Sequence, residues 1–183
     1  MPDAPRATKI LLIRHSEKPD ASNEGVSPYG APDPKSLSVK GWQRAGALAC
    51  FFAPPEGVAR HPALAAPQFI FASHSSSKRP EESVLPLAEK LGLRVNLDFG
   101  KGDEDRLVLA AKDCAGVVLI SWQHEYMVAV ANAILGDNRI APQEWPKERF
   151  DLVWIFDLDP QSGRYRFSQL PQRLLSGDST SLL

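Results

Sequence analysis

The sequence predicts an α/β fold of three layers (αβα), in which helices cover both faces of a mostly parallel sheet with an antiparallel edge. Runs typical of strands alternate with runs typical of helices along most of the 183 residues, the pattern of parallel sheets with helical crossovers. Late in the chain, alternating runs at 150–158 and 164–170 are joined by DPQSG, which predicts a hairpin. The length suits one domain, placed at residues 1–183.

The first predicted strand is KILLIR, residues 9–14, in which four aliphatic residues follow one another without alternation. Such a run is typical of a strand that is buried on both faces of a sheet. A helix is predicted at 37–52, because apolar residues such as Leu48 and Phe52 recur there at helical spacing. Ser38 is a suitable N-cap for this helix.

The second strand and helix follow the same order. PQFIFAS, residues 67–73, predicts a strand, and residues 78–93 predict a helix that ends near Gly92. Pro86 lies inside this helical stretch, where its missing N–H should kink the helix or confine the part before it to a first turn.

Two further strands and helices complete the predicted sheet before the hairpin. RVNLDF at 94–99 alternates as a strand does, and residues 103–115 have helical spacing with acids in the first turn. GVVLISW at 116–122 is a second continuous apolar run. The helical run at 125–135 stops at Gly136.

Composition excludes several classes of protein. The formal net charge of −1 gives no overall attraction to nucleic acid or to an anionic membrane. The sequence contains no apolar stretch of signal-peptide or membrane-spanning length, so we expect a cytoplasmic protein without a membrane partner. Cys50 and Cys114 have no metal-ligand spacing, and we expect them to be reduced and mostly buried.

Charged and polar residues follow three of the predicted strands. Arg14 and His15 end the first, a serine-rich run leads from the second to Arg79, and His124 follows the fourth. Parallel strands place their carboxyl ends on one edge of the sheet, where ligands bind. Taken singly, Arg79 is more typical of a solvated residue and His124 of a helix start. Together, beside helix N-termini, these residues indicate a phosphate pocket.

These residue types also indicate a reaction. A neutral imidazole is a nucleophile toward phosphorus, and guanidinium groups bind phosphoryl oxygens as a fork and offset their charge. A second imidazole, when protonated, donates to another phosphoryl oxygen. A carboxylic acid must still give a proton to the departing alkoxide.

Four segments in order resemble the histidine phosphatase superfamily, whose fold is phosphoglycerate mutase-like. LLIRHSEKP resembles its Arg-His-Gly signature, and LSVKGWQRA resembles its Leu-Ser/Thr-x-x-Gly-x-x-Gln/Arg-Ala helix start. FASHSSSKRPEES resembles the strand, loop and helix that bear the second arginine, and VVLISWQHE resembles the strand that leads to the second histidine. The resemblance spans roughly residues 9–135.

The resemblance implies a role for each matched residue. His15 would be the phosphorylated nucleophile, and Arg14, Arg79 and His124 would complete the phosphate pocket. No metal and no organic cofactor is implied. Ser16 departs from the family, because glycine is usual at its position, and it adds a side chain beside the nucleophile.

The remaining departures concern the second histidine and the acid. Trp122 and Gln123 precede His124 where the family has a small residue, and His74 is a second candidate nucleophile without a preceding arginine. One branch of the family places the acid directly after the second histidine, which favours Glu125. Another places it after the third strand, where the alternatives are Asp98, Asp103 and Glu104.

The function we expect is hydrolysis of a phosphomonoester through a phosphohistidine on His15, with His124 and Glu125 as further catalytic residues. The alternatives are a phosphohistidine-protein phosphatase, a phosphotransferase of the phosphoglycerate mutase type, and a non-catalytic phosphate- or phosphopeptide-binding module. The substrate would be a phosphorylated small molecule or a phosphoprotein, with no nucleic acid involved. The loops at 19–37 and 136–149 contain no motif that names it or the oligomeric state.

Overall fold

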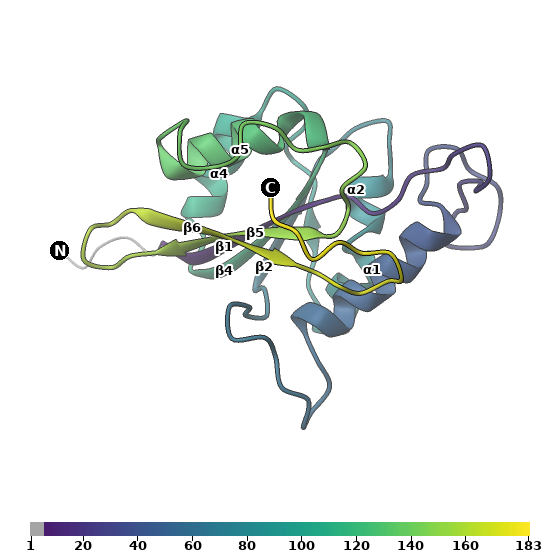
Figure 1. Ribbon diagram of the computed structural model, residues 1–183, viewed down its shortest axis with the longest axis horizontal. Coiled ribbons are helices and arrows are strands. Elements are labelled where there is room, and N and C mark those ends of the chain that lie inside the picture. Colours follow the sequence, from purple (N-terminus) through teal and green to yellow (C-terminus); the bar gives the residue numbers. More distant parts are fainter. Residues whose placement is uncertain (1–5) are drawn as a thin grey trace.

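The computed structural model describes residues 6–183 and consists of a six-stranded sheet between two layers of helices (Figure 1). The strands are β1 (Ala7–Arg14), β2 (Phe69–Ala72), β3 (Val95–Asn96), β4 (Gly116–Trp122), β5 (Leu152–Leu158) and β6 (Tyr165–Pro171). Their spatial order is β3-β2-β4-β1-β5-β6. The first four are parallel, and β5 and β6 are antiparallel to their neighbours. The predicted fold class, with its antiparallel edge, is confirmed.

Helices cover both faces of this sheet. They are α1 (Val39–Phe52), α2 (Arg79–Glu82), α3 (Leu85–Leu91), α4 (Glu104–Lys112), the 3₁₀ helix η1 (His124–Tyr126) and α5 (Met127–Leu135). In Figure 1, α4 and α5 lie above the sheet and α1 lies below it. Ser38 caps α1 as predicted, because its Oγ accepts a hydrogen bond from the backbone N–H of Gly41 at 3.1 Å.

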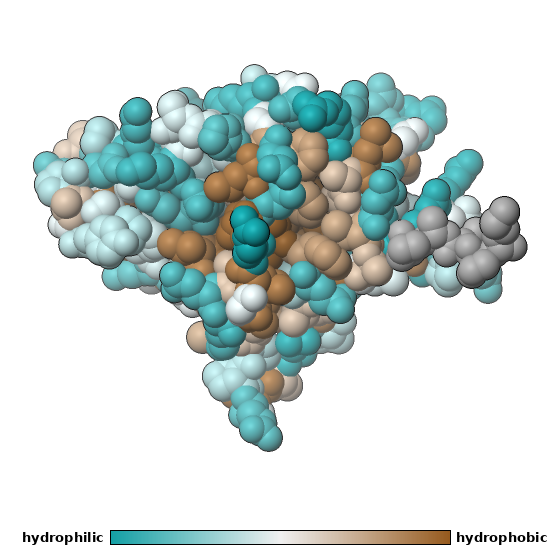
Figure 2. Space-filling view, turned by 180° about the vertical axis from the view of Figure 1, so that it is seen from behind, coloured by the Kyte–Doolittle hydropathy of each residue, from teal (hydrophilic) through white to brown (hydrophobic). Residues whose placement is uncertain are grey.

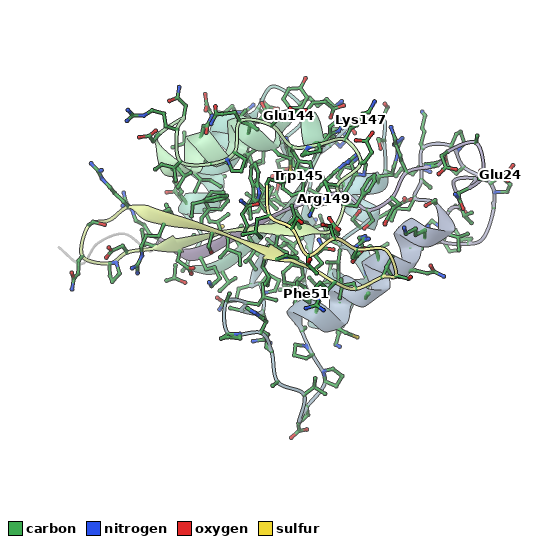
Figure 3. All side chains as sticks on the ribbon, in the orientation of Figure 1. Glu24, Phe51, Glu144, Trp145, Lys147 and Arg149 are labelled. Carbon is green, nitrogen blue, oxygen red and sulfur yellow. The ribbon has the colours of Figure 1, made fainter. Side chains whose placement is uncertain are left out.

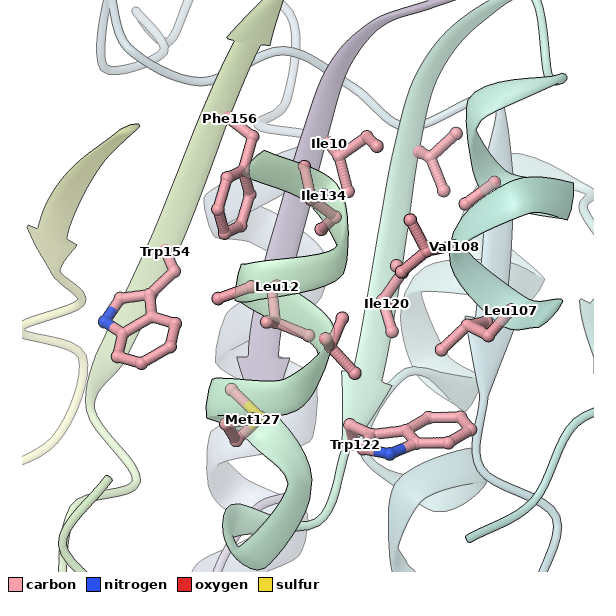
Figure 4. Packing of buried hydrophobic residues seen from close by; sticks show 14 of the residues in the cluster. Ile10, Leu12, Leu107, Val108, Ile120, Trp122, Met127, Ile134, Trp154 and Phe156 are labelled. Atoms are coloured by element: carbon pink, nitrogen blue, oxygen red, sulfur yellow. The ribbon is translucent and has the colours of Figure 1, made fainter. Parts of the chain in front are cut away.

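The two layers of the core explain why KILLIR is apolar throughout. Successive side chains of a strand point to opposite faces. Ile10 and Leu12 therefore pack under α4 and α5, whereas Leu11 and Ile13 pack against α1 and α3. Figure 4 shows the first of these layers, with Leu12 beside the α5 helix. A strand covered by helices on both sides leaves polar residues only at its end, where the site lies.

The expectation for residues 78–93 is confirmed, because the part before Pro86 is confined to the single turn of α2 and α3 follows it. Two other local expectations need correction. β3 covers only Val95–Asn96, because the side chains of Asn96 and Asp98 hydrogen-bond each other and the backbone locally, which competes with the ladder. Cys50 is exposed, because it lies on the solvent side of α1.

The surface on the far side from Figure 1 has hydrophobic residues over its centre and polar ones around them (Figure 2). β3 is the edge strand of the sheet, and its residue Val95 is partly buried.

Across residues 6–183, no helix is both long and apolar enough to cross a membrane.

Candidate active site

The carboxyl ends of β1, β2 and β4 meet at a cavity of about 280 Å³. β4 pairs in parallel with both other strands, so Arg14 lies opposite Trp122 and Ala72 lies opposite Ser121. The chain therefore leaves all three strands at one level. The residues that line the cavity are Arg14, His15, Lys18, Ser75, Ser76, Ser77, Arg79, Lys101, Gln123, His124 and Glu125.

His15 is held in one tautomer by a backbone carbonyl. It is 5% exposed, and its Nδ1 lies 2.7 Å from the carbonyl oxygen of Ser16. A carbonyl only accepts, so Nδ1 bears the hydrogen and Nε2 keeps the lone pair. Burial, together with the positive charges of Arg14 and Arg79, lowers the pKa of His15 to about 3. The imidazole is therefore neutral at pH 7.

Arg14 is anchored by one nitrogen of its guanidinium. NH1 donates to the carbonyl oxygens of Lys147 and of Arg149, the latter at 3.2 Å, and Figure 3 shows both residues on the segment before β5. The Phe150 ring lies 3.8 Å from the guanidinium carbon. Within residues 6–183, the buried Nε and NH2 have no acceptor. Burial lowers the pKa of Arg14 to about 10, which leaves it cationic at pH 7.

A serine couples the second arginine to the loop after His15. Ser83 Oγ accepts from the backbone N–H of Ser16 at 2.7 Å and donates to the carbonyl of Arg79 at 2.7 Å. The start of α2 and the backbone beside His15 therefore share one hydroxyl. Burial lowers the pKa of Arg79, an effect that Glu82 opposes.

His124 and Glu125 follow β4 in the short helix η1. Nδ1 of His124 lies 3.1 Å from a carboxylate oxygen of Glu125. Burial and the charge of Arg14 lower the pKa of His124. Burial alone would raise the pKa of Glu125, but a backbone N–H and the charges of His124 and Lys101 lower it. Without a ligand, the pair is a neutral imidazole beside a carboxylate.

The other acids considered from the sequence lie elsewhere. Glu104 is buried and accepts from Trp122 Nε1 at 3.2 Å, so it is tied into the core beneath β4. Asp103 accepts from the backbone N–H of Gly100 and from the Arg106 side chain, and Asp98 bonds Asn96. Of the four acids, Glu125 alone lines the cavity within the part of the chain described.

Two contributions to the site escaped the sequence analysis. Lys101 lines the cavity from the loop between β3 and α4, which follows a strand end at the same edge of the sheet. The carbonyls that hold Arg14 belong to residues 146–149, which lie over 130 positions away in the chain. No feature of the sequence indicates which backbone carbonyls will accept hydrogen bonds from a distant arginine. His74 is exposed and outside the cavity lining.

Within residues 6–183, no group of three or more His, Cys, Asp or Glu side chains is placed to hold a metal ion. A scan against models of known protein families finds no match, and a search of curated proteins finds none either. Solved structures, by contrast, match over most of the chain.

Three of these structures are phosphatases or candidate phosphatases. The first is a candidate phosphohistidine phosphatase, SixA, from Agrobacterium tumefaciens, with a TM-score of 0.54, 16% identity and coverage of 89% of this chain and 97% of that one. The second is a mycobacterial glucosyl-3-phosphoglycerate phosphatase in complex with VO3, with a TM-score of 0.54, 13% identity and the same coverage. The third is a candidate alpha-ribazole-5'-P phosphatase from Escherichia coli, with a TM-score of 0.54, 12% identity, and 93% and 100% coverage.

This chain has the histidine phosphatase fold. The expected phosphoglycerate mutase-like architecture is thereby confirmed. At these identities the likeness concerns the fold, and a fold hosts many substrates. The argument for activity in this histidine phosphatase fold therefore rests on the side chains of the cavity.

Proposed function

We propose that the protein is a phosphatase that hydrolyses a phosphomonoester through a phosphohistidine on His15. The observation that carries this proposal is the fixed tautomer of His15. Its Nδ1–H is bound to the Ser16 carbonyl, so a neutral Nε2 is available as the nucleophile, in a cavity that also contains Arg14 and Arg79. The substrate is a phosphorylated small molecule or a phosphoprotein.

In the first step, the lone pair of His15 Nε2 forms a bond to phosphorus while the bond from phosphorus to the ester oxygen breaks. Arg14 Nε and NH2, which have no acceptor within residues 6–183, are suited to bind two phosphoryl oxygens as a fork. Arg79 offsets further charge in the loose transition state. A bound phosphate dianion raises the pKa of Glu125, because like charges disfavour its ionised form, and the acid protonated in this way gives its proton to the departing alkoxide.

In the second step, water attacks the phosphorus of the phosphohistidine. The Glu125 carboxylate, which the first step leaves ionised, takes a proton from this water. The nitrogen–phosphorus bond breaks, and its electron pair returns to Nε2. Inorganic phosphate leaves, and His15 and Glu125 return to their starting protonation states.

His124 changes its charge when the substrate binds. Burial and Arg14 lower its pKa in the free protein, so it is neutral at pH 7. A phosphate dianion in the cavity raises that pKa, because opposite charges stabilise the protonated form. The imidazolium then donates to a phosphoryl oxygen from one nitrogen, while its Nδ1 lies 3.1 Å from the Glu125 carboxylate.

A phosphohistidine-protein phosphatase is the second candidate, and the ionised state of Glu125 favours it. The lowered pKa of this carboxyl makes it a weak source of a proton in the free protein. A histidine nitrogen is a better leaving group than an alkoxide and makes less demand on an acid. A mutase is less favoured, because residues 97–103 between β3 and α4 leave little chain for a lid.

The test is intact-protein mass after brief, acid-quenched exposure to an activated aryl phosphate, with released phosphate followed in parallel. Wild type should gain an acid-labile phosphoryl group and release phosphate, and His15→Ala should do neither while remaining folded. Full turnover by His15→Ala would contradict the proposal. If wild type shows neither adduct nor release, and phosphate still raises its melting temperature, the protein is a phosphate-binding module.

A phosphohistidine-bearing protein is the second substrate to compare. The phosphomonoesterase proposal expects release from the aryl phosphate that depends on His15. Release from the phosphoprotein alone, again dependent on His15, would favour the second candidate.

A further inference from the structure

Arg44 is a buried arginine of α1 that joins three segments of the chain. It is 2% exposed, and all five of its N–H groups have acceptors. Nε and NH2 donate to the Glu17 carboxylate at 2.8 to 3.1 Å. NH1 and NH2 donate to Asp178 at 3.0 and 2.7 Å, and NH1 also donates to Gln172 Oε1 at 3.0 Å. The guanidinium is therefore fixed in one orientation.

Glu17 connects the fixed guanidinium of Arg44 to His15, which lies two positions before Glu17. Its side chain is bound by Arg44, and its carbonyl accepts from the backbone N–H of Ser38 at 3.0 Å and from Ser38 Oγ at 3.1 Å. Ser16, the residue between His15 and Glu17, provides the carbonyl that sets the tautomer of His15. A shift of Glu17 therefore moves that carbonyl and the imidazole with it.

The segment that contains Asp178 reaches the phosphate pocket by a second route. The backbone N–H of Ser179 donates to Asp151 at 2.6 Å, and Asp151 accepts from Arg149 Nε at 2.7 Å. Arg149 NH2 donates to the carbonyl of Ser181 at 2.9 Å. The carbonyl of Arg149 is one of those that hold Arg14 NH1. The carboxyl-terminal segment thus supports both members of the Arg14–His15 pair.

Asp178 takes part in both routes, because it binds Arg44 and directly precedes Ser179. Its side chain is 5% exposed, and besides Arg44 it accepts from the backbone N–H groups of Leu174 and Leu175 at 2.8 and 3.1 Å. Burial alone would raise its pKa, but Arg44 and these two N–H groups lower it, so the carboxylate is ionised at neutral pH. Removing its charge leaves Arg44 with only one carboxylate.

We propose that Asp178 is a positioning residue for phosphoryl transfer, which acts through Arg44 and Glu17 on His15. The inference rests on the proposed function of the cavity, and it adds the carboxyl-terminal segment 172–181 to the parts that the reaction needs. Asp178 does not line the cavity with His15, so its effect passes through the residues that it holds.

The test compares Asp178→Asn with Asp137→Asn, which removes a partly exposed partner of Arg139 that has no contact with the proposed network. The measurements are kcat and KM for the aryl phosphate and the affinity for orthovanadate, all under conditions where circular dichroism shows each variant folded. In Asp178→Asn we expect kcat to fall at least about tenfold, with vanadate bound about tenfold more weakly, because small displacements of reacting groups are costly. Asp137→Asn should stay within about twofold of wild type.

Two further variants separate positioning from stability. Asp178→Glu keeps the charge and moves it by about one methylene, so its kcat should lie between those of wild type and Asp178→Asn. If Asp178→Asn fails to fold, Asp178→Glu is compared with wild type instead. The double variant Glu17→Gln, Asp178→Asn should lose less kcat than the product of the two single losses, because both carboxylates act through Arg44.

The outcomes distinguish this inference from the proposed function. A folded Asp178→Asn with wild-type kcat and vanadate affinity would overturn the positioning role, and so would an equal loss in Asp137→Asn. Independent, multiplicative losses in the double variant would also overturn it. If wild type has no phosphatase activity, the proposed function fails, whereas the vanadate affinities of the same variants still decide whether Asp178 orders the pocket.

Discussion

His15 donates a hydrogen bond from Nδ1 to the backbone carbonyl of Ser16, its own neighbour in the chain, at 2.7 Å. The contact needs no partner from elsewhere in the fold, and it decides which ring nitrogen keeps its lone pair. Because the ring is also 5% exposed and faces two arginines, it stays neutral down to an acidic pH. The protein therefore stabilises the neutral form of the imidazole at the expense of its protonated form.

The first prediction concerns stability against pH. Folded His15 has a pKa of about 3, whereas an unfolded histidine takes a proton below about pH 6.5. Protons therefore stabilise the unfolded chain as pH falls from 6.5 toward 3, and the free energy of unfolding decreases. Between pH 7 and 5, wild type should lose about 2 kcal/mol more than His15→Gln does.

Urea unfolding of both proteins at the two pH values measures this difference. His74→Gln, which changes an exposed histidine, should follow wild type instead. Equal pH dependence in wild type and His15→Gln would show that the ring is protonated in the folded protein.

The second prediction concerns the acid. Glu125→Gln should lower kcat/KM about 100-fold for an alkyl phosphate, whose alkoxide needs a proton, and much less for an activated aryl phosphate. Steady-state kinetics with the two substrates gives the ratio directly. Asp103→Asn, which changes an acid of the α4 N-terminus, should not alter that ratio. If Asp103→Asn changes the ratio of the two kcat/KM values and Glu125→Gln does not, Asp103 and not Glu125 is the acid.

The third prediction concerns the anchored arginine. In Arg14→Lys, an ammonium replaces a guanidinium that is held by backbone carbonyls at one nitrogen and leaves two others for the ligand. A single point charge cannot do both, so kcat should fall about 100-fold and vanadate should bind more weakly. Arg139→Lys, at an exposed ion pair, is the matched control and should retain activity.

The fourth prediction concerns close packing of α1 against the loop after the nucleophile. A Cβ at Gly41 would lie 2.4 Å from the Glu17 carbonyl oxygen, whereas a Cβ at Gly46 of the same helix meets nothing within 4 Å. Gly41→Ala should destabilise the fold by about 1–3 kcal/mol and lower kcat, because Glu17 must move. Gly46→Ala should stabilise it by up to about 1 kcal/mol.

Urea unfolding and aryl phosphate turnover test the glycine pair together. Similar stabilities for the two variants would mean that the loop yields to the added methyl group. A stability loss at Gly41 without any change in kcat would separate the packing of α1 from catalysis.

Much of the fold was predictable because the signals are local. Two apolar runs, KILLIR and GVVLISW, are typical of strands covered on both faces, and their order with the helices indicates parallel pairing. Parallel pairing in turn predicted that the residues after β1, β2 and β4 lie at one edge, and the structure does bring Arg14, His15, Arg79 and His124 to one cavity. Their roles remain proposals.

The errors arose where neighbouring side chains compete with the backbone pattern. The alternation in RVNLDF suggested six strand residues, but Asn96 and Asp98 bond each other and leave a strand of two. The sequence analysis also left the acid among four residues. The structure shows that Glu125 lines the cavity, whereas Glu104 is bound to the indole of Trp122 beneath the sheet.

The sequence by itself determined the order of strands and helices and the residue types at the strand ends, because both depend on neighbours a few positions apart. Only the tertiary structure decided which groups support them. Arg44 meets Asp178 across 134 positions, and Arg14 meets the carbonyl of Arg149 across 135. Such contacts arise when distant segments pack against the same sheet edge. Neither a hydrogen bond to a backbone carbonyl nor a buried ion pair produces a periodic pattern of residues in the sequence.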